Sequence, residues 1–401
     1  MKTVITGASG FVGRLLVSEL IAAGHTLLLV GRDAKKLAQV FPDVPVCEYT
    51  QLSEHGTDYD LLVHLAVVNN DAALPEQDFF ATNVDFLLDV ARSAKRAGIK
   101  RFVNISSIHA LDLRNTTAYA RSKREGAAAL AAEDALASKT IYLPLVYGAQ
   151  WAGKLKLLNV LPRPLAVFAF APLAALKPTV HIERLVEDIL SNAPVSSDKP
   201  VILSNDQNSN YFYTVTKRLF DLTFAVAIIG LLGWFLLLIW IAIRLESPGP
   251  GIFAQPRVGK GGEVFTCYKF RTMQAGTEQA GTHEISAAAV TKLGAFMRKT
   301  KIDELPQVWN ILRNEVSLIG PRPCLPVQDE LIEARRNYGV FSVKPGISGL
   351  AQINGIDMSE PATLALWDAR YIALRSLLFD LKITFATATG SGQGDKTNTG
   401  I

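Results

Sequence analysis

One uncharged, apolar segment in the middle of the sequence constrains the fold more than any other feature. It runs from Leu222 to Ile243, and charged residues lie on both sides of it, namely Lys217, Arg218, Asp221, Arg244 and Glu246. A helix of about 20 apolar residues reaches across a bilayer core. The alternative is a buried core helix, which we disfavour because the segment has no polar face. We therefore predict an apolar membrane helix over residues 219–244.

Length, charge and cysteine usage narrow the class of protein. A chain of 401 residues suits two domains, and its net charge of +4, without blocks of like sign, argues against a nucleic-acid partner. Its three cysteines, Cys47, Cys267 and Cys324, show neither zinc-site spacing nor a disulfide framework, which indicates a reducing compartment. Because the sequence opens on MKTVITGASG, a strand and a turn, we expect no cleavable signal peptide.

The residues before the apolar segment alternate between strands and helices. We expect strands at residues 2–6, 27–30, 59–67, 101–107 and 139–148, and helices at 11–23 and 83–97. This alternation predicts a Rossmann-type, doubly wound parallel sheet. A stretch rich in Ser, Asn, Asp and Pro follows at 191–210. We accordingly expect a first domain (1–205), a membrane anchor (206–250), a small, mostly helical α/β domain (251–390) and a disordered tail (391–401).

A glycine-rich turn, TGASGFVG, follows the first expected strand. Gly7 permits a tight turn, Gly10 lets a pyrophosphate approach the backbone, and Gly13 lets the following helix pack on the sheet. Asp33, about 20 residues further on, suits a ribose hydroxyl, whereas Arg32 suits a 2′-phosphate, so NAD and NADP are both open. The alternative is a glycine turn without a ligand, which the position at the start of a βαβ unit disfavours.

A tyrosine and a lysine four residues apart, Tyr119 and Lys123, share one face of an expected helix. A nearby ammonium favours the phenolate, so Tyr119 can exchange a proton with a sugar hydroxyl or carbonyl. Ser107, at the end of an expected strand, can hydrogen-bond the same oxygen. The alternative for such a pattern is an ordinary helix surface.

These features resemble the extended short-chain dehydrogenase/reductase family, in its branch of sugar-nucleotide epimerases, dehydratases and reductases. The likeness covers about residues 1–190 and also includes VHLA (63–66), Asn83, PLVYG (144–148) and VHIERLVEDI (180–189). It implies that Tyr119 is the acid/base, that Lys123 lowers its pKa and holds the ribose, and that Ser107 polarises the substrate oxygen. Reduction of a 4-keto sugar and 4-epimerisation both remain open.

An apolar, proline-containing stretch at 161–176 departs from that resemblance, because the substrate-binding part of the domain is short. The stretch could be a substrate lid, a docking surface or a membrane-contacting patch. A non-catalytic first domain that senses NAD(P) or docks partners is the rival hypothesis, and the Ser107, Tyr119 and Lys123 set counts against it.

Two adjacent acids, Asp303 and Glu304, lie in a basic neighbourhood after the apolar segment. The cations around them are Arg298, Lys299, Lys301, Arg313 and Arg322. A carboxylate among cations stays ionised at neutral pH and can act as a nucleophile, and the cations suit a diphosphate substrate. The alternative is a helix N-terminal cap before Pro306. A cap explains neither the apolar segment upstream nor the GPRP sequence downstream.

Four segments together resemble the bacterial sugar transferase family, the monotopic phosphoglycosyl transferases, from about Thr216 to Thr387. They are KRLFD (217–221), YKFRTM (268–273), RKTKIDELPQVWNIL (298–312) and SLIGPRP (317–323). The resemblance implies transfer of a phosphosugar from a UDP-sugar to polyprenol (undecaprenyl) phosphate, with release of UMP, a Mg²⁺ ion and a covalent enzyme intermediate. It implies that Asp303 is the nucleophile and that Glu304 supports proton handling, with both acids as metal ligands. The candidates to hold phosphates are Lys269, Arg298 and Arg322.

Two positions depart from that family. Gly233-Trp234 stands where members often break the membrane helix with Ser-Pro. Ile356 stands where they often carry an Arg, whose role either passes to Lys344 or is absent.

The location of the substrates predicts the topology. NAD(P) and UDP-sugars are cytosolic, so both domains must face the cytoplasm although they lie on opposite sides of the apolar segment. We therefore predict a re-entrant helix and a monotopic protein on the cytoplasmic face of the bacterial inner membrane. The expected partners are a UDP-sugar, polyprenol phosphate and membrane lipid, and a homo-oligomer is left open. A membrane-anchored structural protein is the rival from another class.

Overall fold

The computed structural model describes residues 1–68, 73–133, 136–149, 151, 153–191, 200–274 and 289–390. The tail predicted at 391–401 lies outside the described residues. Two compact units make up the chain. The first comprises Met1–Phe170 and Pro178–Asn205, and the second comprises Ala171–Lys177 and the residues from Asp206 onward.

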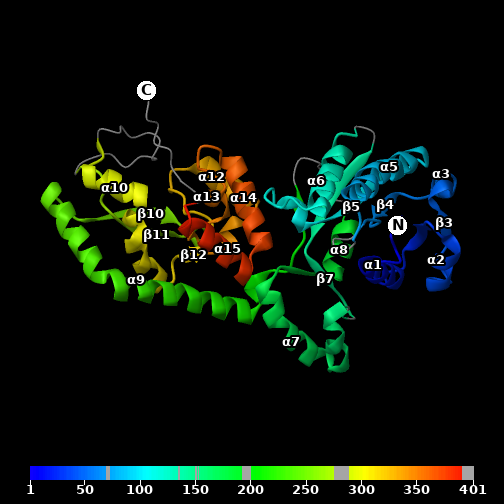
Figure 1. Ribbon diagram of the computed structural model, residues 1–401, viewed down its shortest axis with the longest axis horizontal. Coiled ribbons are helices and arrows are strands. Elements are labelled where there is room, and N and C mark those ends of the chain that lie inside the picture. The colour runs from blue at the N-terminus through cyan, green and yellow to red at the C-terminus, as the bar shows by residue number, and fades with distance from the viewer. Residues whose placement is uncertain are drawn as a thin grey trace. The chain divides into compact units, whose positions relative to one another are not determined.

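The first unit is built on a seven-stranded sheet of order β3-β2-β1-β4-β5-β6-β9, in which neighbouring strands are parallel (Figure 1). The strands are β1 (Lys2–Thr6), β2 (Thr26–Gly31), β3 (Val46–Glu48), β4 (Leu61–His64), β5 (Arg101–Ser107), β6 (Ala137–Leu143) and β9 (Val201–Ile202). Val, Ile and Leu dominate them because both faces of the sheet are buried.

Helices cover both faces of this sheet. Those on one face are α1 (Phe11–Ala22) and α8 (Ile182–Leu190), and those on the other are α3 (Leu52–His55), α5 (Phe86–Arg96) and α6 (Ala118–Ala131). Alternate residues of each strand point to opposite faces, as Val4 and Ile5 do. The Rossmann-type doubly wound sheet predicted from the sequence is confirmed.

Pro144 divides the strand that the sequence predicts at 139–148. β6 stays in the main sheet, whereas β7 (Leu145–Tyr147) pairs with β8 (Thr179–His181) in a separate two-stranded sheet. Proline has no N–H to donate to a neighbouring strand, so the ladder ends at that residue. The prediction of one continuous strand was therefore wrong.

The helix predicted at 83–97 also has a different form. It begins at Glu76 and consists of α4 (Glu76–Phe80), a π-helical turn (Ala81–Asp85) and α5. In that turn the buried Asn83 accepts a hydrogen bond from the backbone N–H of Val68 at 3.2 Å and donates one to Ser122 Oγ at 2.9 Å. The π-turn thus ties α4 and α5 to helix α6.

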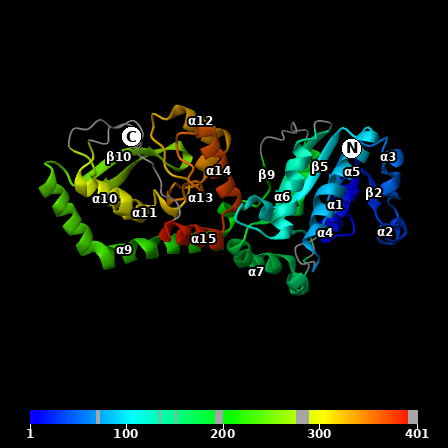
Figure 2. The same ribbon diagram turned by 45° about the horizontal axis from the view of Figure 1, so that its top comes forward.

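The apolar segment of the second unit forms one long helix, α9 (Tyr211–Glu246). It begins eight residues before the predicted start at 219, because the Asn210 side chain accepts hydrogen bonds from the backbone N–H groups of Phe212 and Tyr213 and caps the helix there. The helical backbone continues through Gly233-Trp234. Figures 1 and 2 both show α9 bending along its length, without an interruption.

The remainder of the second unit is a small, mostly helical α/β fold. Its sheets are an antiparallel hairpin of β10 (Ile252–Val258) and β11 (Val264–Phe270) and a parallel pair of β12 (Ser317–Ile319) and β13 (Gly346–Ser348). Its helices are α10 (Lys292–Thr300), α11 (Val308–Leu312), α12 (Asp329–Asn337), α13 (Leu350–Ile353), α14 (Pro361–Leu374) and α15 (Leu377–Ala388).

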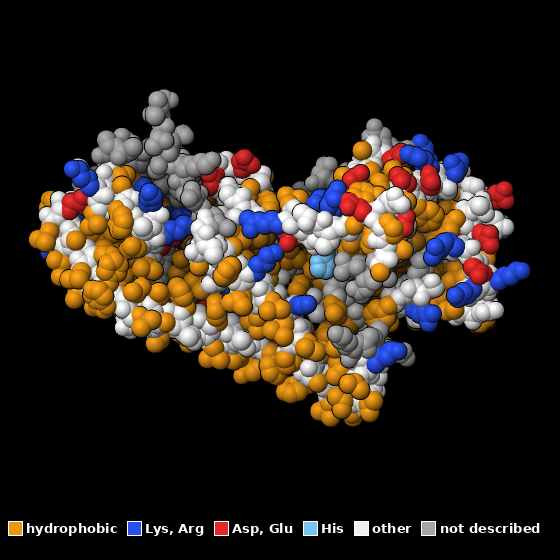
Figure 3. All heavy atoms as spheres, in the orientation of Figure 1, with side chains coloured by type: hydrophobic (Ala, Val, Ile, Leu, Met, Phe, Trp, Pro, Cys, Tyr) orange, Lys and Arg blue, Asp and Glu red, His pale blue; other side chains and the backbone are white. Residues whose placement is uncertain are grey.

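Both halves of α9 pack against this fold. Ala225, in the first half, contacts the apolar side chains of Val308 and Ile311 on α11. Ile239 and Ile243, in the second half, pack in a cluster whose other buried members are Phe270 and Met297. The apolar side chains left exposed on α9 are Leu219, Val226, Ile229, Leu231, Trp234, Leu237, Leu238, Ile241 and Leu245. Figure 3 shows apolar side chains gathered along this helix.

Candidate active sites

The glycine-rich turn of the first unit connects β1 to α1. Gly7 has a φ of +71°, and a Cβ added there would lie 2.6 Å from the backbone N of Ala66. A Cβ added at Gly13 would lie 2.4 Å from the carbonyl oxygen of Gly7. Both positions therefore need glycine for reasons internal to the fold.

Gly10 differs from the other two glycines of the turn. Its backbone is extended, with φ −69° and ψ 167°, and an added Cβ would meet only the carbonyl oxygen of Gly7, at 3.3 Å. Packing within the protein thus does not demand glycine at this position. Gly10 is also the N-cap residue of α1, where backbone N–H groups and the helix dipole favour an anion. The turn therefore fits a dinucleotide pyrophosphate.

The acidic residue at the end of β2 has a structural role in this structure. Asp33 caps α2 (Ala34–Val40) by accepting a hydrogen bond from the backbone N–H of Lys36 at 2.9 Å. Arg32, beside it, is exposed. Neither observation distinguishes a ribose hydroxyl from a 2′-phosphate as the partner of this pair.

The proposed catalytic triplet of the first unit lies on β5 and α6. Ser107 is the last residue of β5, and its Oγ accepts a hydrogen bond from the backbone N–H of His109 at 3.3 Å. Tyr119 and Lys123 lie one turn apart on α6, as predicted, and the rings of His109 and Tyr119 meet edge to face with centroids 6.4 Å apart. These elements bring the predicted hydroxyl, phenol and amine to the carboxyl end of β5.

Lys123 is buried in this arrangement. Its side chain donates a hydrogen bond from Nζ to the carbonyl oxygen of Ile105 at 2.9 Å, and 5% of the residue is exposed. Burial lowers the pKa of Lys123 to about 7. The ammonium and the neutral amine are thus close in free energy near neutral pH, so a small change in the surroundings can shift the proton.

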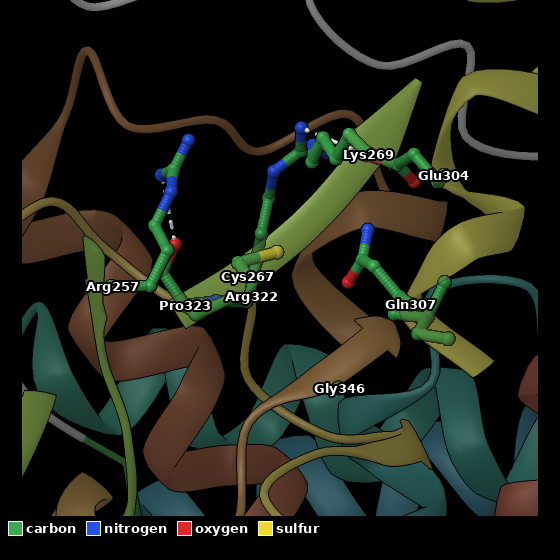
Figure 4. Close-up of a pocket in the computed structure, with 9 residues that line it drawn as sticks. Arg257, Cys267, Lys269, Glu304, Gln307, Arg322, Pro323 and Gly346 are labelled. Carbon is green, nitrogen blue, oxygen red and sulfur yellow. Dashed lines mark hydrogen bonds and ion pairs between the residues drawn. The ribbon is translucent and has the colours of Figure 1, made fainter. Parts of the chain in front are cut away.

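A polar pocket in the second unit collects residues from distant parts of the sequence. Its lining residues are Arg257, Cys267, Lys269, Glu304, Gln307, Arg322, Pro323, Gly346 and Ile347. The β10–β11 hairpin supplies three of them, and the turn before α11 and the loop after β12 supply others. Figure 4 shows Lys269 beside Glu304, with Arg257 on the opposite side of the pocket.

Glu304 is the centre of the ion pairs in this pocket. Its Oε1 accepts from Lys269 Nζ at 2.8 Å and from Arg322 Nη2 at 3.4 Å. Burial alone would raise the pKa of Glu304, but these two cations outweigh it and lower that pKa to about 2. Glu304 is therefore a permanent anion that holds the two cations toward the pocket.

Asp303 has the opposite electrostatic environment. Burial, followed by repulsion from the adjacent Glu304 carboxylate, raises the pKa of Asp303 to about 6, against the effect of the cations. A carboxylate with this pKa is mostly ionised at neutral pH and is more basic than an exposed aspartate. In the sequence the two acids share one set of neighbouring cations, and the structure gives them different electrostatic environments.

The other predicted phosphate ligands divide into two groups. Lys269 and Arg322 line the pocket. Arg298, on α10, donates from Nε to Thr272 Oγ1 at 3.0 Å and belongs to the charges that act on Asp303, but it is outside the set of lining residues.

Ile356, at the position where the bacterial sugar transferases often carry an arginine, has apolar surroundings. Ile356 packs in a cluster that includes Leu331 and Leu364. Lys344, considered as a replacement, hydrogen-bonds Asn314 Oδ1 and is also outside the set of lining residues.

The prediction from sequence missed Arg257 and Gln307. Arg257 donates to the carbonyl oxygen of Pro323 at 3.1 Å and to Gln255 Oε1 at 2.7 Å. Gln255 pairs with Cys267 across the hairpin, so the residues two positions away, Arg257 and Lys269, lie on the same face. Strand alternation could have indicated this shared face, but only once the hairpin register was known.

Of the two carboxylates predicted to hold a metal ion, Glu304 lines the pocket, whereas the adjacent Asp303 is outside the set of lining residues. Among the described residues, no group of three or more His, Cys, Asp and Glu side chains could hold a metal. Mg²⁺ is commonly held by one or two carboxylates together with substrate phosphates and water, so Asp303 and Glu304 fit that mode of binding.

Family comparisons match the two units separately. Residues 212–392 match the family described as bacterial sugar transferase. Residues 3–169 match the family described as NAD dependent epimerase/dehydratase.

Curated relatives match the second part of the chain. An uncharacterized sugar transferase, EpsL, of Bacillus subtilis is 40% identical, over 43% of this chain and 85% of its own length. The UDP-glucose:undecaprenyl-phosphate glucose-1-phosphate transferase of Caulobacter vibrioides is 38% identical, over 43% of this chain and 67% of its own length. The undecaprenyl-phosphate glucose phosphotransferase of Komagataeibacter xylinus is 39% identical, and the match spans only 35% of that protein.

Solved structures match the first part of the chain at low similarity. The enzyme WbmG of Bordetella bronchiseptica, crystallised with NAD, is 19% identical, with a TM-score of 0.39, over 51% of this chain and 72% of its own. At this level the likeness supports no statement about function.

Proposed function

Because this chain belongs to the bacterial sugar transferase family through residues 212–392, we propose that its second unit transfers a phosphosugar from a UDP-sugar to undecaprenyl phosphate and releases UMP. The observation that carries the proposal is the pair of acids beside the polar pocket. Asp303 is the more basic of the two, and Glu304 is an anion bonded to Lys269 and Arg322. The relatives whose names state undecaprenyl phosphate as a substrate support the choice of acceptor.

Asp303 acts as the nucleophile in the proposed mechanism. Its carboxylate oxygen attacks the phosphorus that bears the sugar, and the bond from that phosphorus to the bridging diphosphate oxygen breaks, so UMP leaves with the oxygen. A phosphate oxygen of the polyprenol phosphate then attacks the same phosphorus, and the bond to Asp303 breaks. The carboxylate is regenerated without a net change in protonation.

The cations of the pocket stabilise the charge that develops during both steps. Lys269 and Arg322 are held by Glu304 before the substrate binds, so they need little reorganisation in the transition state. Arg257, on the facing side, adds a third positive charge. A Mg²⁺ ion held by Asp303, Glu304 and the diphosphate would neutralise further charge on the phosphates.

The test replaces the nucleophile and an exposed acid in parallel. We expect Asp303→Asn to reduce UMP release by roughly 1000-fold or more, because the amide cannot form the intermediate. Asp329→Asn, at an exposed position on α12, is the matched control and should leave the rate unchanged. The assay uses the detergent-extracted chain with a panel of UDP-sugars, Mg²⁺ and undecaprenyl phosphate. Unchanged UMP release from Asp303→Asn would exclude the mechanism.

The first unit, by our proposal, reduces or 4-epimerises the UDP-sugar with NAD or NADP. NAD(P), when bound, supplies or accepts the hydride. Tyr119 exchanges a proton with the sugar oxygen, Ser107 hydrogen-bonds that oxygen, and Lys123 supports the phenolate from one turn along α6. The family match over residues 3–169 and the cradle formed by the glycine turn support this assignment.

A tyrosine at the other edge of the sheet provides the control for this activity. We expect Tyr119→Phe to reduce sugar-nucleotide turnover by roughly 100-fold or more. Tyr59→Phe lies just before β4, at the amino edge of the sheet, and should have little effect. The assay supplies UDP-sugars with NAD⁺, and a UDP-4-keto-sugar with NADPH. Turnover that survives Tyr119→Phe unchanged would favour an NAD(P)-sensing or docking role.

The proposed location is the cytoplasmic face of the inner membrane, with α9 embedded from one side. Packing of both halves of α9 on a single globular unit supports this, because a spanning helix would have to leave that unit. The exposed apolar face then contacts lipid while the opposite face stays on the protein. In this proposal α9 enters and leaves the same side of the membrane as a continuous bent helix, without the Ser-Pro break that family members often have.

A further inference from the structure

A second apolar surface lies outside both candidate sites. It is formed by the short 3-10 helix η4 (Gly153–Val160) and by α7 (Arg163–Leu176). Its exposed apolar side chains are Leu157, Val160, Leu161, Leu165, Val167, Phe168, Leu173 and Leu176. We call these eight residues the α7 patch. Leu157 is 79% exposed, Val160 84% and Phe168 66%, so the patch loses contact with water only if something else covers it.

The stretch of sequence that carries the α7 patch contains basic residues and no acids. No Asp or Glu occurs between Asp134 and Glu183 in the sequence. Among the side chains that the structure describes in this stretch, the exposed cations are Lys156, Arg163 and Lys177. The segment that opens α9 contributes one acid, Asp206, which is paired with Arg375. An apolar surface with basic residues is the combination that binds an anionic lipid surface, where apolar insertion and electrostatic attraction act together.

The second half of α7 makes the contacts that hold this helix. Phe170 packs against the rings of Tyr147 and Trp151, with centroids 4.9 Å and 4.4 Å away. The segment Ala171–Lys177 belongs to the second unit, where its carbonyl groups accept hydrogen bonds from the loop that opens α9.

The bonds to the start of α9 connect the patch to the apolar helix. Asn210, the N-cap residue of α9, donates from Nδ2 to the carbonyl oxygen of Ala171 at 2.9 Å. Gln207 donates from Nε2 to the carbonyl oxygen of Ala174 at 2.7 Å. The end of α7 is therefore attached to the residues at which α9 begins.

We propose that η4 and α7 form a second membrane-binding element, which inserts the α7 patch into the headgroup region of an anionic bilayer. The occupant is lipid, because the patch combines apolar side chains with basic residues on the same segment and is attached to a helix with an exposed apolar face of its own. This inference rests on the proposed membrane location of α9.

The test introduces a reporter thiol on the patch. The native residues Cys47, Cys267 and Cys324 are buried, so labelling is directed to an added cysteine. Phe168→Cys in the full chain is labelled with an environment-sensitive fluorophore and reconstituted in vesicles of phosphatidylcholine and phosphatidylglycerol, with and without shallow spin-labelled lipid. Leu165→Cys is a second position on the same helix, in case the first variant folds poorly.

Two further positions calibrate the signal. Leu237→Cys, on the exposed face of α9, reports whether that helix is in lipid. Leu113→Cys, an apolar position that is 69% exposed elsewhere in the first unit, reports the signal of a water-exposed label. We expect the Phe168 label to be quenched at least threefold more than the Leu113 label. Replacement of Lys156, Arg163 and Lys177 by Gln, or omission of phosphatidylglycerol, should reduce that difference.

The outcomes separate this inference from the proposed function. Quenching at Leu237 without quenching at Phe168 and Leu165 would overturn the α7 proposal and leave the location of α9 intact. Quenching at none of these positions would overturn both. A Phe168 label that is shielded from water, unquenched by lipid and able to cross-link to a second copy would mean that another chain covers the patch, which also overturns the proposal.

Discussion

Three glycines in one turn illustrate how the same residue type can be present for different reasons. Gly7 and Gly13 are required because any Cβ would collide with nearby backbone atoms, whereas a Cβ at Gly10 would make a single tight contact, 3.3 Å from the Gly7 carbonyl oxygen. We therefore expect Gly7 and Gly13 to be needed for folding and Gly10 to be needed for binding a ligand. The sequence pattern alone does not distinguish the three positions.

Gly10→Ala and Gly13→Ala test this distinction. We expect Gly13→Ala to lower the free energy of unfolding of the first unit by about 2–3 kcal/mol, because its Cβ would overlap the Gly7 carbonyl. Gly10→Ala should change it by less than about 1 kcal/mol but weaken NAD(H) binding roughly tenfold or more. Urea unfolding and a cofactor titration measure the two effects. Wild-type cofactor affinity in Gly10→Ala would contradict a pyrophosphate at this turn.

His64 gives the first unit a pH dependence of its own. It is fully buried at the end of β4, with Nδ1 2.9 Å from Thr6 Oγ1, and burial lowers its pKa from 6.5 to about 3. Between those values the unfolded chain binds a proton that the folded chain does not. The free energy of unfolding should therefore fall by up to about 1.4 kcal/mol per pH unit as the pH drops below 6.5, with no contribution from this group above that value.

His64→Gln should remove this part of the pH dependence. Urea unfolding between pH 4 and 8 is the measurement, and the slope, rather than the absolute stability, is compared with wild type. Lys123 titrates at higher pH, since its pKa in the folded chain is about 7, so it does not obscure this range. Equal slopes in the two proteins below pH 6.5 would contradict the assignment.

At the scale of single elements, the charged segment KRLFD (217–221) connects α9 to the rest of the second unit. Lys217 donates to the carbonyl oxygen of Ile319 at 3.1 Å, and Arg218 donates to that of Leu312 at 3.1 Å. Asp221, which is 2% exposed, accepts from Ser317 Oγ and from the backbone N–H of Leu318, each at 3.0 Å. The hydrogen-bond partners of these three side chains lie 94 to 102 residues further along the sequence, so a local sequence pattern does not predict them.

Asp221→Ala tests how firmly α9 is held. The substitution leaves the Leu318 N–H and the Ser317 hydroxyl without this acceptor inside the fold, so we expect a loss of about 2–4 kcal/mol in the free energy of unfolding of the second unit. Asp221→Asn keeps an acceptor oxygen and should cost clearly less. Thermal unfolding in detergent gives the comparison. Equal melting temperatures for the two variants would mean that Asp221 does not anchor the helix.

Local sequence signals predicted the local features of both units. The β1–turn–α1 segment, the Tyr119–Lys123 spacing and the apolar helix depend on neighbouring residues, and the structure contains all three. The features missed depend on distant partners or on backbone chemistry. Pro144 ends the strand pairing of β6, and the Asn210 cap makes α9 begin before the predicted start at 219. The pairing register of the β10–β11 hairpin places Arg257 on the same face as Lys269, at the pocket.

The opposite pKa shifts of the two acids could not be predicted from the sequence either. Asp303 and Glu304 are neighbours in the sequence with the same cations around them. The 3-10 turn directs Glu304 toward Lys269 and Arg322, which come from β11 and from the loop after β12. Their difference in pKa thus comes from side-chain direction rather than composition.

At the scale of the whole molecule, the packing of α9 bears on how the chain meets the bilayer. If α9 crossed the membrane, Ile239 and Ile243 would lose their contacts with Phe270 and Met297, and these apolar surfaces would be exposed. An arrangement in one leaflet keeps these contacts. It also leaves the residues before and after α9 on the same side of the membrane.

Thiol labelling in sealed inner-membrane vesicles tests the topology. Lys260→Cys, exposed in the hairpin after α9, and Lys36→Cys, exposed in the first unit, are treated with a membrane-impermeant maleimide. We expect both to react only in inverted vesicles, in which the cytoplasmic face is outward. Reaction of Lys260→Cys in right-side-out vesicles would show that α9 crosses the bilayer.

The short connection between the two units limits how far the first unit can lie from the start of α9. Asn205, the last residue of the first unit, hydrogen-bonds Tyr147 at 2.8 Å, and α9 begins at Tyr211. Even fully stretched, the few residues between them reach roughly 20 Å. If α9 is held in lipid as proposed, this short segment tethers the first unit to the membrane, so the amount of that unit a cell can hold would scale with membrane area and not with cell volume.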